Sequence, residues 1–178
     1  MRWELRRVAD LSADEQAALR TLSLAVYPPE VAAAWPGRVI EWAPHQWGII
    51  GWDADGAPLC HVGAVLREAR WNDRAVRVGG IGGVKTHPTS RGRGFATTAI
   101  QRALDFFHNQ GEVDFGLLVC EPGLAPFYER LGWRSFPGDL LVTQHKATVP
   151  FTFNLPMTIP IRLQESLGGK IDLLGPPW

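Results

Sequence analysis

The residues best suited to chemistry form a glycine-arginine run, Arg91-Gly92-Arg93-Gly94, which lies between a strand-like segment and a helix-like one. Gly92 and Gly94 have no side chain, so phosphate oxygens can approach the backbone closely. The free N–H groups and the positive dipole at the start of a following helix would face the same anion, and Arg91 and Arg93 add positive charge. The pattern therefore predicts a phosphate-binding loop.

A helix is expected directly after this loop. Its apolar residues keep the spacing of one buried face, and Gly111 is a suitable C-cap. The residues of that face are Ala96, Ala99, Ile100, Ala103, Leu104 and Phe107. A phosphate in the loop would thus lie at the N-terminus of a helix packed on the core.

A second segment, residues 124–133, is typical of a short helix that carries Tyr128 and ends in a turn at Gly132 before Trp133. Together the two segments resemble the acetyl-CoA site of the GNAT acyltransferase superfamily. Its signature of Arg or Gln, two residues, Gly, one residue, then Gly or Ala is met by Arg91, Gly94 and Ala96. The resemblance covers about residues 45–145.

This resemblance implies that acetyl-CoA is bound by the end of the preceding strand, the loop and the first turn of the helix. The backbone of the strand would hold the pantetheine arm, and the Val84 N–H would stabilise the oxyanion of acyl transfer. The expected cofactor-binding residues are Val84, Thr86, Arg91, Gly92, Arg93, Gly94, Phe95, Ala96 and Thr97.

Two side chains are expected to take part in catalysis. Tyr128 corresponds to the family tyrosine that protonates the departing thiolate, although an aromatic on a helix can also simply fill the core. Glu121 stands where many relatives have Asn or Ser, at the end of the apolar run 115–119. It would hold the acceptor ammonium or take its proton, the alternative being a solvated loop carboxylate.

Within the superfamily the chain resembles the aminoglycoside 2'-N-acetyltransferases, in the stretch from residue 127 to 138, in a late strand ending at 154–156 and in ending on Trp178. This resemblance implies substrate contacts from Glu41, Trp42 and Glu121 and from the terminal carboxylate of Trp178. Two acidic residues of the mycobacterial-type relatives are replaced, by Gly82 and by Pro176. Their loss favours a weakly cationic amino sugar, for example of the kasugamycin type, over a polycation.

Other interpretations of the same residues are weaker. The glycines at 79–83 suggest a dinucleotide fingerprint, but the chain continues as strand through Thr86 instead of opening a helix. An arginine-glycine segment can bind nucleic acid, yet 18 basic and 18 acidic residues leave no basic excess. Cys120 lacks a neighbouring His or Asn partner in the sequence, so covalent catalysis is not expected.

Composition indicates one globular domain over residues 1–178. The chain is 46% hydrophobic and 20% charged, with no apolar run of the roughly 20 residues needed to cross a bilayer. The acidic N-terminal region lacks the apolar core of a signal peptide, and two cysteines form neither a disulfide framework nor a metal quartet. We expect a cytoplasmic protein without a metal, a small-molecule amine as partner, no nucleic-acid or membrane partner, and a possible homodimer.

The expected fold is α+β, with a mixed, mainly antiparallel twisted sheet flanked by helices. A capped helix is predicted from Ser12 to the prolines at 28 and 29, and residues 30–44 are less regular. Strands are predicted at 47–52, 59–69, 75–86, 113–120, 140–143, 149–157 and 159–161, with turns at 53–56 and 72–73 and a tail over 166–177.

The sequence thus predicts an acetyl-CoA-dependent N-acetyltransferase acting on an amino sugar, with antibiotic resistance as its role. One alternative is a GNAT enzyme for another amine, such as an amino acid, a polyamine or a peptide N-terminus. A second is a non-catalytic acyl-CoA-binding or regulatory module, which Tyr128 disfavours.

Overall fold

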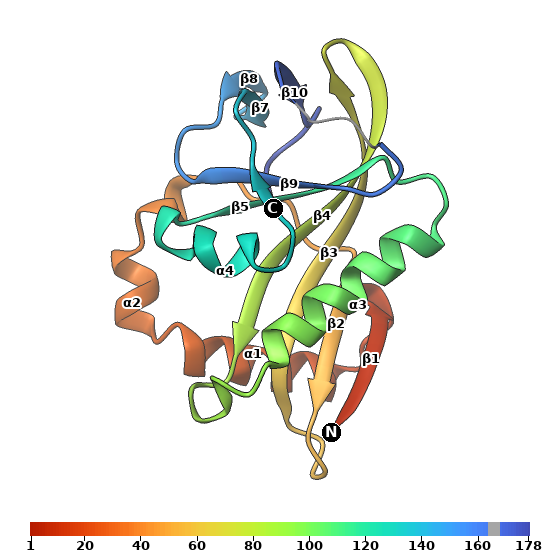
Figure 1. The fold of residues 1–178 in the computed structure, drawn as a ribbon. Helices are drawn as coiled ribbons and strands as arrows, with labels where there is room; N and C mark the ends of the chain where they lie inside the picture. The colour runs from red at the N-terminus through yellow and green to blue at the C-terminus, as the bar shows by residue number, and fades with distance from the viewer. Residues whose placement is uncertain (164–167) are drawn as a thin grey trace.

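A computed structural model describes residues 1–163 and 168–178. Its centre is a twisted sheet with the strand order β6-β9-β5-β4-β3-β10-β7-β8, to which β2 and then β1 add beside β3 (Figure 1). Two described strand pairs, β4 with β5 and β10 with β7, are parallel, and the others are antiparallel. The expected α+β fold with a mixed, mainly antiparallel sheet is confirmed. The strands are β1 Arg2–Arg7, β2 Trp47–Trp52, β3 Pro58–Trp71, β4 Arg74–Thr86, β5 Phe115–Cys120, β6 Arg134–Ser135, β7 Asp139–Gln144, β8 Ala147–Pro150, β9 Leu155–Pro160 and β10 Lys170–Asp172.

Two tight turns join the central strands, as the sequence predicts. Between β2 and β3, the Asp53 carboxylate accepts N–H groups from Asp55 and Ala57 at 2.9 and 2.8 Å. Between β3 and β4, Asn72 and Asp73 adopt φ angles of 48° and 65°. Asn and Asp tolerate this left-handed region better than most residues, which fixes the register of the long β3–β4 hairpin.

The described residues form the α-helices α1 Ala13–Val26, α2 Pro29–Ala34, α3 Phe95–Asn109 and α4 Ala125–Glu129, of which α1 and α3 pack on the central strands. Helix α1 begins with a capping box, in which Ser12 and Glu15 bond each other's backbone N–H groups. Neighbouring strand residues show that α1 and α3 cover opposite faces, because successive side chains on a strand alternate. Ile49 packs in the cluster that holds α3, and Ile50 packs in the cluster that holds α1. In the described part of the chain, no helix is both long and apolar enough to span a bilayer.

The parallel pair β4–β5 separates partway along its length. Its ladder covers only Val78–Gly80 on β4 against Phe115–Leu117 on β5. Beyond that point β4 continues to Thr86 beside β3, whereas β5 continues beside β9. The two strands therefore splay into a notch, with the loop before α3 at its open end.

The chain after β6 forms an arm on the far side of β3. Strands β7 and β8 make a hairpin, and β10 lies between β3 and β7. The arm closes a second hydrophobic core, whose buried residues include Val65, Val78, Phe115, Phe136, Leu140, Val142, Ile171, Leu173 and Trp178.

Several boundaries differ from the sequence-based prediction. The predicted tail over 166–177 is wrong for residues 168–177, because β10 pairs there and Ile171 and Leu173 are buried; residues 166 and 167 lie outside the described residues. The single strand predicted at 149–157 is two strands, β8 and β9, separated by residues 151–154. Strand β1 was not predicted, since its burial is set by pairing with β2 rather than by a clear alternation of its own.

Candidate active site

The loop predicted to bind phosphate has open backbone at its glycines. Gly92 and Gly94 have φ angles of 73° and 76°, and no atom lies within 4 Å of the point where a Cβ would be at either residue. Gly94 is the N-cap of α3, and its carbonyl accepts the first helical bond from the Thr98 N–H at 3.0 Å. The N–H groups of residues 95–97 therefore remain free of intrahelical partners at this end.

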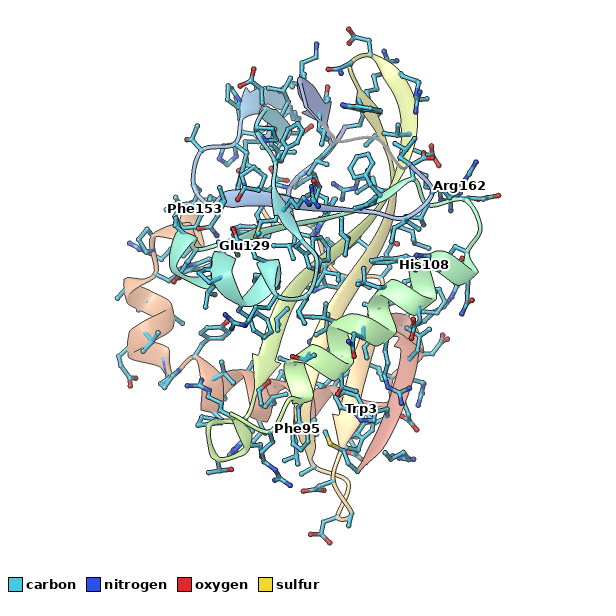
Figure 2. All side chains as sticks on the ribbon, in the orientation of Figure 1. Trp3, Phe95, His108, Glu129, Phe153 and Arg162 are labelled. Atoms are coloured by element: carbon cyan, nitrogen blue, oxygen red, sulfur yellow. The ribbon has the colours of Figure 1, made fainter. Side chains whose placement is uncertain are left out.

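Charge at this end of α3 favours an anion. The first turn contains no acidic residue. Arg93 lies over the Phe95 ring at 4.9 Å, and Phe95 contacts Trp3 of β1 edge to face at 6.4 Å (Figure 2). Arg91 is exposed. Together with the helix dipole, this arrangement fits the diphosphate of the expected cofactor.

The last residues of β4 line the notch. Residues 82–86 are half-buried, unlike the buried stretch before them. Gly83 and Val84 form a bulge, since two residues of β4 stand opposite Val62 of β3. Gly83 has a φ of 55°, a conformation that favours glycine. The bulge turns the backbone at the position where sequence analysis expects the oxyanion donor, Val84.

Tyr128 lies in α4 and is 6% exposed. Its ring contacts Phe127 and Trp133 edge to face at 5.0 and 6.4 Å. Burial raises the pKa of the phenol far above its ordinary value, and the nearby Cys120 and Tyr27 act in the same direction. The hydroxyl therefore keeps its proton at any working pH, as a proton donor must.

Cys120 ends β5 next to this tyrosine. Its thiol is buried, and its Sγ lies 3.7 Å from the Met157 Sδ. Burial, followed by the charge of Glu121, raises the pKa of this thiol to about 11. A thiol held in its neutral form is a poor nucleophile, which agrees with the expectation that Cys120 forms no covalent intermediate.

Glu121 is exposed at the carboxyl end of β5, where η4 (Pro122–Leu124) begins. Its charge and that of Arg91 both act on Tyr27, the residue at the end of α1; burial first and then Glu121 raise the pKa of Tyr27, whereas Arg91 lowers it. The mouth of the notch thus brings together a carboxylate, a guanidinium group and a phenol. Sequence analysis missed Tyr27, whose only local signal is its place before the prolines that end α1.

Trp178 lies across the notch side of β4. Its indole packs against Gly80, where a Cβ would overlap the ring, and its Nε1 donates to the Leu117 carbonyl at 3.3 Å. Its backbone carbonyl carbon is 3.0 Å from the point where a Cβ would be at Gly82. Arg67 covers the ring at 5.0 Å. The ring is therefore part of the core, and only the backbone end of Trp178 faces the half-buried part of β4.

Glu41 and Trp42 connect to the arm. The Glu41 backbone exchanges two hydrogen bonds of 2.9 Å with the Gln144 amide, and its carboxylate accepts the His145 N–H at 3.2 Å. Trp42 stacks on Trp35 at 5.7 Å and donates to a backbone carbonyl. The carboxylate of Glu41 is thus bound at the β7–β8 turn, in contrast to the exposed carboxylate of Glu121.

Two histidines also lie at β4, the half-buried His45 and the buried His61, and sequence analysis missed both. His45 comes from the loop before β2 and packs over Gly63 and Gly82; His61, on β3, has its Nδ1 3.3 Å from the Gly83 carbonyl. Isolated histidines give no motif, and the only sequence signal is the set of glycines that makes room for them.

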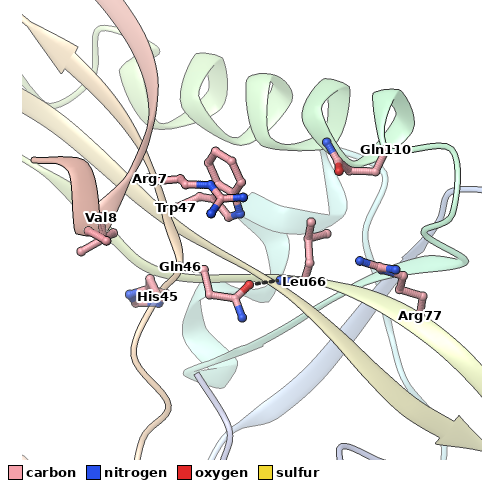
Figure 3. Close-up of a pocket in the computed structure, with 9 residues that line it drawn as sticks. Arg7, Val8, His45, Gln46, Trp47, Leu66, Arg77 and Gln110 are labelled. Atoms are coloured by element: carbon pink, nitrogen blue, oxygen red, sulfur yellow. Dashed lines mark hydrogen bonds between the residues drawn. The ribbon is translucent and has the colours of Figure 1, made fainter.

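A pocket of about 740 Å³ opens at the edge of the sheet near these histidines (Figure 3). It lies toward the C-terminal end of α3, at the opposite end of that helix from the glycine-arginine loop. Its lining residues are Arg7, Val8, Ala9, His45, Gln46, Trp47, Leu66, Arg77 and Gln110. Among the described residues, no group of three or more His, Cys, Asp or Glu side chains could hold a metal ion.

Comparison with known proteins fits this geometry. Solved structures with the same fold include ElaA from Escherichia coli, 18% identical over 89% of this chain and 98% of that chain, with a TM-score of 0.63. The E. coli GNAT family N-acetyltransferase YhbS in complex with CoA is 13% identical over 98% and 91%, with a TM-score of 0.63. A GNAT family acetyltransferase from Brucella melitensis in complex with acetyl-CoA is 17% identical over 75% and 84%, with a TM-score of 0.52.

No curated protein is significantly similar in sequence. A model of the acetyltransferase (GNAT) domain, however, matches residues 4–136, which is well over half of the chain and includes the glycine-arginine loop, β4, β5 and α4. The chain belongs to the GNAT acetyltransferase domain family.

Proposed function

We propose that this protein transfers the acetyl group of acetyl-CoA to a primary amine of a weakly cationic amino sugar. The observation that carries the proposal is the notch between β4 and β5, which has a helix start without acidic residues at one end and buried Tyr128 beside it. Two of the structures with the same fold hold CoA or acetyl-CoA, which supports this choice of donor.

The donor would bind along the free edge of β4. Its diphosphate would rest on Gly92, Gly94 and the free N–H groups of residues 95–97, with Arg91 and Arg93 supplying charge. Its pantetheine arm would run beside Val84 and Thr86, where β4 has no partner on β5. The backbone of the loop is accessible to a diphosphate, because nothing lies within 4 Å of the point where a Cβ would be at Gly92 or Gly94.

The chemistry follows from the groups at the notch. The amine nitrogen attacks the thioester carbonyl, and the Val84 N–H at the bulge stabilises the oxyanion. The carbon–sulfur bond then breaks, and the Tyr128 hydroxyl gives its proton to the thiolate. Glu121 binds the ammonium form of the acceptor at the mouth.

The balance of charge at the mouth supports a weakly cationic acceptor. Glu121 and Arg91 both act on Tyr27, so the acidic and basic charges there partly cancel. The stacked pair Trp35 and Trp42, with Phe153 edge-on to both, adds aromatic surface of the kind that packs on sugar rings. A polycation such as a typical aminoglycoside would gain less from this surface than a compound of the kasugamycin type.

Thiol release from acetyl-CoA, measured with a panel of amines, tests the proposal. We expect kasugamycin or a related amino sugar to be acetylated, and Glu121→Gln to raise the acceptor KM by about 10-fold with acetyl-CoA binding unchanged. Glu129→Gln, which removes another exposed carboxylate near by on α4, is the control and should behave as wild type. If only an amino acid or a polyamine is acetylated, that amine and not an amino sugar is the acceptor. If no amine releases thiol from acetyl-CoA, the protein is an acyl-CoA-binding module.

We also place this reaction in the cytoplasm, because Cys60 and Cys120 are both unpaired and buried, as is usual in a reducing compartment.

A further inference from the structure

The histidine pair at β4 has no part in the mechanism above. His45 and His61 lie on the face of the sheet that Gly48, Gly63 and Gly82 leave without side chains. Their rings meet edge to face at 6.4 Å. His61 is tied to the Gly83 carbonyl, whereas His45 makes no hydrogen bond to any described residue through its Nε2.

The Nε2 of His45 is both buried and unpartnered, and it points at the strand that carries the bulge. A Cβ added at Gly82 would lie 2.7 Å from this nitrogen. Gly82 lies two residues before Val84, the proposed oxyanion donor. A buried polar atom without a partner costs free energy, so its retention beside the reacting groups indicates that it bonds something in the working enzyme.

The surroundings of His45 keep it uncharged. Burial, followed by the charge of Lys85, lowers the pKa of His45 to about 4. The pKa of His61 on β3 is lower still, about 3, and its two largest causes are again burial and then the charge of Lys85. Burial also lowers the pKa of Lys85. With Arg7 across the pocket, these are charged and titratable neighbours of the ring, and at neutral pH the ring is uncharged and can accept a proton.

His45 also reaches the pocket at the sheet edge, where it lies with Gln46, Arg7 and Gln110 (Figure 3). The ring of His45 thus lies over β4, and the residue also belongs to the lining of this pocket, which includes polar groups. An imidazole can take a proton on one ring nitrogen and release the other proton from the opposite side.

We propose that His45 is the general base of the reaction, accepting the proton of the acceptor nitrogen on Nε2, directly or through one water, and later releasing it to solvent. This rests on the proposed function. The N–C bond forms and the C–S bond breaks; the amine proton goes to His45, and the Tyr128 proton goes to the thiolate. Tyr128 regains its proton from solvent as His45 releases one, so the net products are the amide and the free thiol.

A base as weak as His45 can take the proton of the acceptor nitrogen only after the N–C bond has formed. It cannot deprotonate a free ammonium group, whose pKa is about 10. Once the N–C bond forms, the nitrogen becomes far more acidic, and a neutral imidazole can take its proton. The ammonium form held by Glu121 must therefore lose its first proton to solvent at the mouth before the nitrogen attacks.

The experiment measures thiol release from acetyl-CoA, with water alone and with the best amine of the panel, for the wild type, His45→Gln and His45→Ala. His108→Ala, an exposed histidine on α3, is the control. We expect both His45 variants to lose about 100-fold or more in kcat with CoA affinity unchanged by calorimetry, and His108→Ala to be active. Imidazole added to the buffer should restore turnover of His45→Ala, since it can occupy the space that the side chain leaves over Gly63 and Gly82.

The activities of the two His45 variants decide whether His45 is the base. If His45→Gln binds CoA and turns over as wild type, His45 is not the base, and this holds even if His45→Ala does not fold. A loss that imidazole does not restore in folded His45→Ala also overturns the proposal, because it indicates a packing role. If the wild type acetylates an amine and the His45 variants are equally active, the proposed function stands and the role of His45 as base is wrong. If the wild type releases no thiol with any amine or with water, both the proposed function and the role of His45 are wrong.

Discussion

Burial of the Tyr128 ring decides what its hydroxyl can do. The side chain lies between Phe127 and Trp133, and Cys120 and Tyr27 are its polar neighbours. Because all of these effects favour the neutral phenol, its proton is present at the moment a thiolate leaves. The interpretation of Tyr128 as a core aromatic and its interpretation as an acid are therefore compatible, since the packing that buries the ring also protects the proton.

Replacing Tyr128 by Phe keeps this packing and removes the proton. We expect kcat to fall by about 10- to 10⁴-fold with CoA affinity little changed. The comparison is Tyr27→Phe, the other tyrosine of the site, which should retain most of the activity. A larger loss in Tyr27→Phe than in Tyr128→Phe, measured by steady-state thiol release, would move the acid role to Tyr27.

A side chain at Gly94 is expected to weaken cofactor binding. The φ of 76° at Gly94 strains any β-branched residue, and a side chain would also stand where the diphosphate is expected. Gly94→Val should reduce CoA affinity by at least about 10-fold by calorimetry. Gly111→Val at the other end of α3 is a matched control, with a φ of 69° and the same open surroundings, so it carries similar strain without a phosphate. Equal CoA affinity in the two variants would show that the loop does not bind the cofactor.

At the scale of elements, the arm after β6 reaches back to the notch. Its last turn is fixed by backbone bonds from Ala43 to Pro177 and from Thr143 to Gly175, and by Arg67, which donates to the Pro176 carbonyl. The indole of Trp178 then fills the space over Gly80. This arrangement places the end of the arm beside β4, although the family model ends at residue 136, before the arm.

Gly80→Ala tests this contact. The new methyl group would overlap the Trp178 ring in a close-packed core, so we expect a loss of about 1–3 kcal/mol in the free energy of unfolding, measured with urea. Gly123→Ala, at a glycine with no atom within 4 Å of the added carbon, should change it by less than about 0.5 kcal/mol. Similar stabilities for the two variants would contradict the packing of Trp178 on β4.

For the whole molecule, His45 and His61 link the free energy of unfolding to pH. Their folded pKa values of about 4 and about 3 lie below the unfolded value of 6.5, so the unfolded chain binds more protons as the pH falls. Their neutral forms support the fold fully above pH 6.5, and this support is lost as the pH falls below that value. Each histidine should contribute a slope of up to about 1.4 kcal/mol per pH unit between roughly pH 4 and 6.

Urea unfolding of wild type, His45→Gln and His108→Gln over this range checks the prediction. Glu15, whose pKa is lowered first by its bond to the Ser12 backbone, has the same sign of effect, so the comparison of variants is needed to isolate the histidine. The slope should be shallower in His45→Gln and unchanged in His108→Gln. Parallel curves for all three proteins would show that His45 is not held neutral by the fold.

The sequence by itself determined the features that depend on neighbours along the chain. The glycine-arginine loop, the helix α3 behind it, the capped start of α1 and the turns at Asp53–Gly56 and Asn72–Asp73 each follow from residues within one or two turns of each other. Their φ angles, caps and apolar spacing are local properties, which is why the helix behind the loop and the central hairpins were predicted correctly. Of the predicted face of α3, Ala96 and Leu104 are only half-buried, Phe106 is buried although it was not predicted, and the C-cap is Gln110, next to the predicted Gly111.

Only the tertiary structure decided which distant residues share the notch. His45 before β2 and Trp178 at the far end of the arm both pack on β4, and Tyr27 at the end of α1 lies within reach of the charges of Glu121 and Arg91. No neighbour of these residues in the sequence indicates this. The physical reason is that glycines at 80 and 82 leave space on the sheet without specifying what fills it. Burial and strand pairing over long separations fill that space, and they also turned the predicted tail into β10 and fixed the Glu41 carboxylate at the β7–β8 turn.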